Sequence, residues 1–225
     1  MNYFAPNMND LAKYLQSTRF IDFNDPAIQA FTQKHTEGLT TNREKAVALY
    51  YAVRDEIVYS PWHLVMNPDV ISASITLKRG VGYCIEKSLV LAACTRFAGI
   101  PSRLGFSIVR NHLSTKKFVE MLKTDKFVFH GYNEFLLDGE WVKCTPAFNK
   151  SLCEKFNTKP LDFDGHSNSI FQEFSPDGRK YMEYLHEYGT FDDFPYDLFY
   201  AETKKHYRHL FESKGEAVFA KEEDF

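Results

Sequence analysis

An Asp138-Gly139 dipeptide between two strand-like segments constrains this chain more than any other feature. The flanking segments are 127–137 and 140–146, and both contain several aromatic and β-branched residues, which are typical of strands. Asp-Gly favours a two-residue type I′ turn, which joins adjacent antiparallel strands. The dipeptide therefore predicts an antiparallel β-hairpin in which Leu137 pairs with Glu140.

This register determines which polar side chains of the hairpin lie together. It places Tyr132 opposite Thr145 and His130 opposite Ala147. Side chains alternate between the two faces of a strand, so the residues expected on one face are His130, Tyr132, Glu134 and Thr145. The hairpin is thus expected to gather an imidazole, a phenol, a carboxylate and a hydroxyl on one surface.

A glycine-bearing turn leads into an apolar helix earlier in the chain. The turn is Gly80-Val-Gly82-Tyr-Cys84, and residues 85–98 behind it contain no helix breaker before Gly99. Cys84 is therefore predicted at the first turn of a largely buried helix. There the positive end of the helix dipole and the unpaired backbone N–H groups favour a thiolate and can hold an oxyanion.

A histidine brought against this helix end would complete a nucleophile and base pair, and a third polar group would orient the imidazole. His130 and a group near Thr145 meet that requirement. The remaining cysteines, Cys94, Cys144 and Cys153, are interpreted as structural. The aromatic residues that flank the cysteine turn either form the walls of a cleft or pack in the core: Tyr59, Trp62 and Tyr83.

The other elements are predicted from capping signals and periodicity. They are helices at about 26–37, 42–57, 72–80 and 194–213, and a strand at 103–110. Repeats and linker-like clusters of glycine and proline are not found, so one α+β domain over residues 1–225 is expected, with its core at about 42–150.

Composition excludes several classes of function. The net charge is −3 and no stretch concentrates Lys and Arg, so a nucleic-acid partner is not expected. The sequence has neither an apolar run of about 20 residues nor the basic and apolar regions of a signal peptide, which indicates a cytoplasmic protein without a membrane partner. Its four cysteines form no CxxC pair, and no metal or organic cofactor is expected.

Successive segments between residues 50 and 147 carry a resemblance to a known family. They are Ser72-Ala-Ser-Ile-Thr-Leu, Gly80-Val-Gly-Tyr-Cys84, the run from Leu89 to Arg103, His130-Gly-Tyr-Asn-Glu134 and Gly139-Glu-Trp-Val142. In this order they resemble the transglutaminase-like superfamily. The resemblance implies a papain-like core, in which a helix carrying a nucleophilic cysteine packs on an antiparallel sheet carrying a histidine and usually an aspartate.

The resemblance also implies roles for individual residues. Cys84 matches the nucleophile and His130 the general base and acid, while Tyr132 and Glu134 match the aromatic and acidic residues of the histidine strand. Thr145 stands where the family usually has the orienting aspartate, and a hydroxyl supplies no charge to stabilise an imidazolium. Three explanations stay open: Thr145 suffices, another residue replaces it, or catalysis is weak or lost. The candidate replacements are Asn149, Asp162 and Asp164.

The expected activity is thioester chemistry on amide bonds, with a peptide or amide as the substrate. Hydrolysis is favoured over crosslinking because the chain lacks recognisable calcium-binding acidic loops and a pro-segment. Two alternatives belong to other classes: a binding module that keeps the fold without turnover, and an acyltransferase that uses a small thioester donor.

Overall fold

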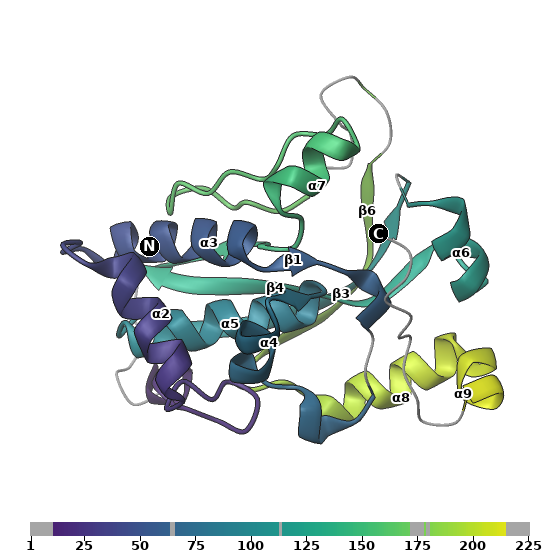
Figure 1. Ribbon diagram of the computed structural model, residues 1–225, viewed down its shortest axis with the longest axis horizontal. Helices are drawn as coiled ribbons and strands as arrows, with labels where there is room; N and C mark the ends of the chain where they lie inside the picture. Colours follow the sequence, from purple (N-terminus) through teal and green to yellow (C-terminus); the bar gives the residue numbers. More distant parts are fainter. Residues whose placement is uncertain (1–10, 64–65, 113, 172–177, 179–180, 215–225) are drawn as a thin grey trace, which may run out of the picture.

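Four antiparallel strands form the main sheet of the computed structural model, which describes residues 11–63, 66–112, 114–171, 178 and 181–214. The strands are β3 (Ser102–Asn111), β4 (Lys126–Leu137), β5 (Glu140–Cys144) and β6 (Met182–Phe191), in the spatial order β5-β4-β3-β6. A short parallel pair joins β1 (Val58–Tyr59) to β2 (Val81–Gly82). Helices pack against the main sheet, which confirms the predicted α+β class (Figure 1).

The predicted hairpin is present, but its second strand is shorter than expected. Leu137 pairs with Glu140, and Asp138 and Gly139 have φ values of 51° and 89°, as a type I′ turn requires. β5 ends at Cys144, and the N–H of Thr145 donates instead to the carbonyl of Ser169 (3.0 Å). The expected pairing of Tyr132 with Thr145 and of His130 with Ala147 was therefore wrong, because the chain leaves the ladder just before Pro146.

The predicted helices begin and end at recognisable caps. They are α2 (Pro26–Thr36), α3 (Asn42–Glu56), α4 (Ala73–Arg79) and α5 (Cys84–Phe97). Thr41 and Glu44 form a capping box at the start of α3, and the Ser72 side chain caps α4. Gly80 ends α4 in the left-handed conformation (φ 71°), which glycine adopts without steric cost.

Helix α5 is the hydrophobic centre of the molecule. All its residues from Cys84 to Arg96 are buried, and it contacts β3 and β4 as well as α2, α3 and α4 (Figure 1). Two further helices, α8 (Tyr196–His206) and α9 (Arg208–Lys214), follow β6, and Phe199 of α8 packs on Phe129 of β4 with ring centroids 5.7 Å apart. Helix α5 therefore lies in a core to which segments far apart in the sequence contribute.

Two short helices lie beyond this core. They are α6 (Lys116–Leu122) and α7 (Lys150–Lys155), and both have exposed as well as partly buried residues. Three 3₁₀ turns complete the described elements: Ala12–Leu15, Pro61–His63 and Pro68–Val70.

Two buried basic side chains tie α5 to its surroundings. Lys87 donates from Nζ to the carbonyls of Arg54 (2.8 Å) and Ile57 (2.6 Å), which lie at the end of α3. Arg96 donates to the carbonyls of Gln16, Ser102 and Asp192, three positions far apart in the chain. Because burial makes an unpaired carbonyl costly, these bonds fix the helix relative to the segments around it.

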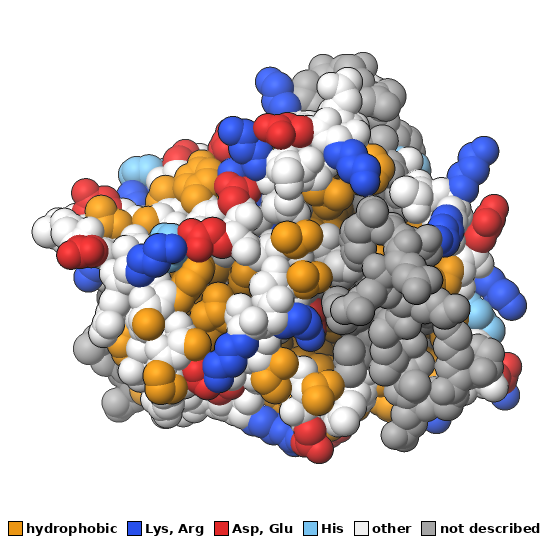
Figure 2. Space-filling view, viewed as in Figure 1, with side chains coloured by type: hydrophobic (Ala, Val, Ile, Leu, Met, Phe, Trp, Pro, Cys, Tyr) orange, Lys and Arg blue, Asp and Glu red, His pale blue; other side chains and the backbone are white. Residues whose placement is uncertain are grey.

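The described residues of the surface seen in Figure 2 carry Lys and Arg interspersed with Asp and Glu. Within the described parts of the chain, no helix has the length and apolar character that crossing a membrane requires.

A glycine in β3 lets the sheet accommodate a tyrosine, and its replacement is expected to be destabilising. A Cβ at Gly105 would lie 2.1 Å from the Tyr132 ring, which is buried and donates from its hydroxyl to Glu187 (2.9 Å). We expect Gly105→Ala to lower the free energy of unfolding by about 1–3 kcal/mol, as overpacking does. Urea denaturation measures this change. In a Tyr132→Ala background the same substitution should cost much less, and equal costs in the two backgrounds would contradict a clash between these residues.

Candidate active site

Cys84 is the first residue of α5 and follows β2 through Tyr83. Its side chain is buried, and the backbone N–H groups of Gly131, Ile85 and Cys84 itself face the thiol and partly lower its pKa. Two of these groups belong to the helix start and the third to β4. The thiol therefore lies where the helix terminus meets the histidine strand, as the turn sequence predicts.

A partly buried ion pair between Arg79 and Glu86 holds the turn before Cys84. Glu86 accepts from the backbone N–H of Tyr83 (3.2 Å) and from the Arg79 guanidinium (2.6 Å), while Arg79 also donates to the carbonyl of Val81 (2.8 Å). Burial raises the pKa of the Glu86 carboxyl to about 7, against the opposing effect of Arg79. This pair connects the end of α4 to the first turn of α5 and thus fixes the position of the thiol.

His130 lies on β4, directly after Phe129, which has a left-handed φ of 64°. This irregularity coincides with a shift in the pairing of β3 and β4 between Ser107 and Val109. The imidazole is buried and contacts the rings of Phe171 and Tyr184, with centroids 5.7 and 6.4 Å away. Its Nε2 atom is buried without a hydrogen-bond partner among the described residues.

Cys84 and His130 line the same small pocket. Its volume is about 80 Å³, and Tyr59 and Tyr83 contribute to its wall. The structure therefore brings together the thiol and the imidazole that the sequence singles out, beside the N–H group of Gly131. This arrangement can deprotonate a thiol and hold an oxyanion in one pocket.

Burial, and not the helix terminus, dominates the titration of both groups. Desolvation raises the pKa of the Cys84 thiol to about 11 and lowers the pKa of His130 to about 4. The N–H groups at the helix start do lower the pKa of the thiol, as expected, but the cost of burying the charge exceeds this gain, so the net shift is upward. At neutral pH the pair consists of a neutral thiol and a neutral imidazole.

Thr145, the predicted orienting residue, is hydrogen-bonded to the segment that packs on the His130 ring. Thr145 is 1% exposed, and its Oγ1 atom has no hydrogen-bond partner in the described part of the chain. Its N–H donates to Ser169, and Phe171, two residues further on, packs against the His130 ring. Thr145 is not among the described residues that line the pocket.

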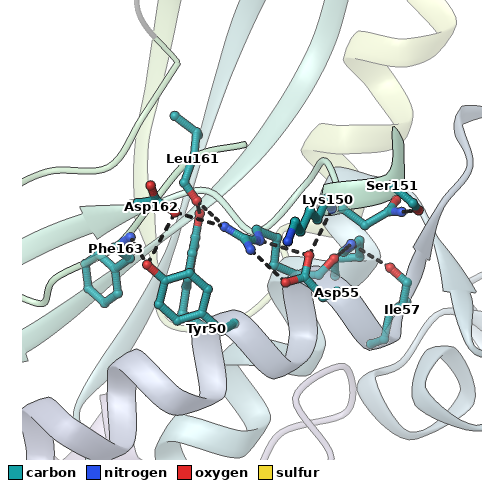
Figure 3. A network of polar contacts seen from close by, with 12 residues as sticks. Tyr50, Asp55, Ile57, Lys150, Ser151, Leu161, Asp162 and Phe163 are labelled. Carbon is teal, nitrogen blue, oxygen red and sulfur yellow. Dashed lines mark hydrogen bonds and ion pairs between the residues drawn. The ribbon is translucent and has the colours of Figure 1, made fainter. Parts of the chain in front are cut away.

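The three alternatives to Thr145 bind other groups. Asn149 accepts from the N–H of Tyr59 (3.0 Å) and donates to Ser151 (2.7 Å). Asp162 lies at the α3 side with Tyr51 and Arg54, in the network that Figure 3 shows, and its side chain is 81% exposed. Asp164 accepts from the backbone N–H groups of residues 166 and 167.

Two other predicted site residues lie away from the pocket. The Tyr132 ring packs over Gly105, and Glu134 forms an ion pair with Arg103 (2.5 Å). Neither is among the described lining residues of the pocket, whereas Tyr59, Tyr83 and Trp62 do line cavities here, as expected of cleft walls. Among the described residues, no group of three or more His, Cys, Asp or Glu side chains could hold a metal ion.

Sequence reasoning missed the contribution of Gly131. Its N–H faces the Cys84 thiol, and a Cβ there would lie 3.1 Å from the Cα of Ile85. The missing side chain thus allows the start of α5 to approach β4 closely. In the sequence, this close approach could have been predicted from the glycine that directly follows His130, the candidate base.

The lowered pKa of His130 predicts a loss of stability in acid. Between pH 6.5 and pH 4 the unfolded chain binds a proton at His130 that the folded protein does not, so the folded state loses stability as the pH falls. We expect wild type to lose up to about 3 kcal/mol relative to His130→Gln over this range. Urea unfolding of both proteins at several pH values measures the difference. A constant difference would show that His130 titrates normally.

A cysteine at the first turn of a buried helix, beside a histidine on an antiparallel sheet, is the arrangement that the resemblance to the transglutaminase-like superfamily implies. The sequence model of the transglutaminase-like superfamily matches residues 29–146, more than half of the chain, and the protein belongs to this superfamily. No curated protein matches the sequence significantly.

Two solved structures are similar to this chain. One is titled "a Putative Cysteine Protease from Cytophaga hutchinsonii"; the match has 18% identity and a TM-score of 0.49, and covers 63% of this chain and 43% of that one. The other is titled "a putative protease from Parabacteroides distasonis"; its match has 18% identity and a TM-score of 0.38, and covers 60% of this chain and 25% of that one. The matched region is thus less than half of either structure's chain.

Proposed function

We propose that this protein is a cysteine hydrolase that cleaves amide bonds through an acyl-thioester on Cys84. The observation that carries the proposal is the shared pocket of Cys84 and His130 beside the Gly131 N–H group. Membership of a superfamily of thiol enzymes supports the same chemistry.

In the proposed reaction His130 takes the thiol proton as the sulfur attacks the substrate carbonyl. The N–H groups of Gly131, Ile85 and Cys84 stabilise the oxyanion of the tetrahedral intermediate. The intermediate collapses with loss of an amine, which receives the proton from His130, and an acyl-thioester remains on Cys84. Water then attacks the thioester, again with His130 as the base, and releases a carboxylic acid and the thiol.

The neutral state of both groups suits this sequence of steps. A proton held by the buried thiol must move as the carbon–sulfur bond forms, so the imidazole acts as a general base within the step. Cys84 and His130 are buried, where the effective dielectric constant is lower than in water, so the oxyanion donors act more strongly there than in solvent.

We propose that Thr145 orients His130, as the family resemblance implies; its buried Oγ1 and the buried Nε2 of His130 form no hydrogen bond in the described structure, so this bond has to form when the substrate binds. Thr145→Val removes the hydroxyl at nearly constant volume. We expect kcat to fall by about 10- to 100-fold with little change in KM, as for residues that orient a catalytic group. Thr145→Ser should restore most of the loss in steady-state assays, and failure of this rescue together with an unchanged kcat in Thr145→Val would remove Thr145 from the mechanism.

The proposed function is tested by trapping the acyl-enzyme. Incubation with 4-nitrophenyl acetate, followed by mass spectrometry of tryptic peptides, should show one acetyl group on Cys84, and His130→Gln should not acquire it. A pool of fluorogenic peptide amides then measures hydrolysis, and an added primary amine measures transfer. Absence of acylation and of turnover in wild type would favour the binding module instead.

A further inference from the structure

A second, larger cavity adjoins the pocket of Cys84 and His130. Its volume is about 510 Å³, and the two spaces share Tyr59, Pro61, Asn111, Phe118, Phe127 and Phe148 as wall residues. The larger cavity therefore lies directly beside the space that the thiol and the imidazole line. A volume in this range is typical of sites that bind small molecules or side chains of a peptide.

Aromatic rings from distant segments make up seven of the sixteen described wall residues. Trp62 packs edge-on against Phe118 of α6 with centroids 5.2 Å apart, Phe118 stacks on Phe127 of β4 (5.4 Å), and Tyr59 contacts Phe148 (4.8 Å). These contacts hold the rings in place before any ligand binds. A preformed aromatic wall favours a bulky apolar group and gains little from a small or polar one.

The charged residues of the described wall are both positive. They are Lys117 of α6, whose Nζ lies 5.5 Å from the centre of the Trp62 ring, and Lys155 at the end of α7. A lysine in the wall attracts a carboxylate on a bound ligand, although each exposed lysine adds little to the binding free energy. The described wall thus combines apolar rings with two lysine side chains.

We propose that this cavity selects the substrate of the enzyme and binds an aromatic or large aliphatic side chain of a peptide that carries a carboxylate next to it. The inference rests on the proposed function for its role in catalysis, whereas the binding itself does not require turnover. The carboxylate belongs either to an acidic side chain or to the end of the peptide, and the experiment separates these two sources.

Binding can be measured without catalysis in Cys84→Ala/Trp141→Phe, which keeps Trp62 in the cavity wall as its tryptophan reporter. The probes are the capped dipeptides acetyl-Phe-Glu-amide, acetyl-Phe-Gln-amide and acetyl-Gly-Glu-amide, and acetyl-Phe with a free carboxylate. We expect Trp62 emission to saturate with a Kd for Phe-Glu at least about tenfold below that for Gly-Glu, because a phenyl group becomes buried. The advantage of Phe-Glu over Phe-Gln should be about two- to fivefold.

Variants of the wall provide the controls. Lys117→Met/Lys155→Met should remove the difference between Phe-Glu and Phe-Gln while leaving the Kd of Phe-Gln unchanged. Ser114→Phe places a ring in the cavity and should weaken every Phe probe at least about tenfold, whereas Ser167→Phe, at an exposed position outside the wall, should not. Tighter binding of acetyl-Phe than of Phe-Glu would assign the carboxylate to a peptide end.

Equal affinities for Phe-Glu and Gly-Glu, or binding that survives Ser114→Phe, would overturn the inference. The same probes converted to fluorogenic amides and given to wild type separate the two proposals. Selective binding in the Cys84→Ala protein without turnover in wild type would contradict the proposed function alone. Turnover that does not favour Phe over Gly and Glu over Gln would contradict the proposed role of the cavity and leave the proposed function intact.

Discussion

Replacing Cys84 by alanine is expected to lower kcat/KM for peptide amides by at least about 10³-fold, and His130→Gln by a similar factor. The sulfur forms the covalent bond, so no neighbouring group can take its place. The oxyanion donors are backbone N–H groups and remain in both variants. Because thiol and imidazole act as a unit, the double variant should be little worse than either single one, which steady-state kinetics with a fluorogenic peptide amide can measure.

Cys94→Ala is the matched control for this prediction. Cys94 lies in the same helix and is fully buried, and the substitution removes the same atom. We expect kcat/KM to stay within about threefold of wild type, with a loss of stability of about 1–2 kcal/mol from the lost packing. Equal losses of activity in the two variants would show that α5 tolerates no change, and would deny Cys84 a special role.

Arg96→Met is expected to lower the free energy of unfolding by about 3–5 kcal/mol, which is large for a single substitution. The guanidinium donates to the carbonyl of Ser102 (2.8 and 3.1 Å), to that of Gln16 (2.8 Å) and to that of Asp192 (2.6 Å). Methionine fills much of the volume but leaves these carbonyls without their donor. Burial lowers the pKa of Arg96 to about 10, so the residue is still charged at neutral pH.

Arg208→Met is the matched control, because the Arg208 side chain is 82% exposed and pairs with Glu212 on the surface. Its effect on the free energy of unfolding should be below about 0.5 kcal/mol. Urea denaturation of the three proteins compares them directly. If Arg96→Met costs no more than Arg208→Met, the carbonyls find other donors and the described bonds are not what joins these segments.

Local signals in the sequence predict those parts of the fold that depend on neighbouring residues. Asp138-Gly139 predicts the hairpin turn, Thr41 and Glu44 predict the start of α3, and the turn before Cys84 predicts the position of the thiol. Each is determined within a few residues by backbone conformation or capping, and each is confirmed.

Other properties of the site depend on residues far apart in the chain. The pKa of Cys84 follows from how deeply the core covers the helix end, which a turn motif does not encode. The early end of β5 depends on Ser169, which takes the hydrogen bond that β4 would have received. The walls of the larger cavity come from segments more than a hundred residues apart, and only the folded chain brings them together.

Because Cys84 lies on the buried helix α5, the surroundings of the thiol tolerate substitutions less well than the exposed helices of the protein do. Any movement of the thiol requires the packing of α5 against β3, β4 and three helices to change as well. Helices α6 and α7, which supply several walls of the larger cavity, contain exposed residues at which substitutions cost little stability. Substitutions in these two short helices can therefore alter the larger cavity, while Cys84 and His130 keep their geometry.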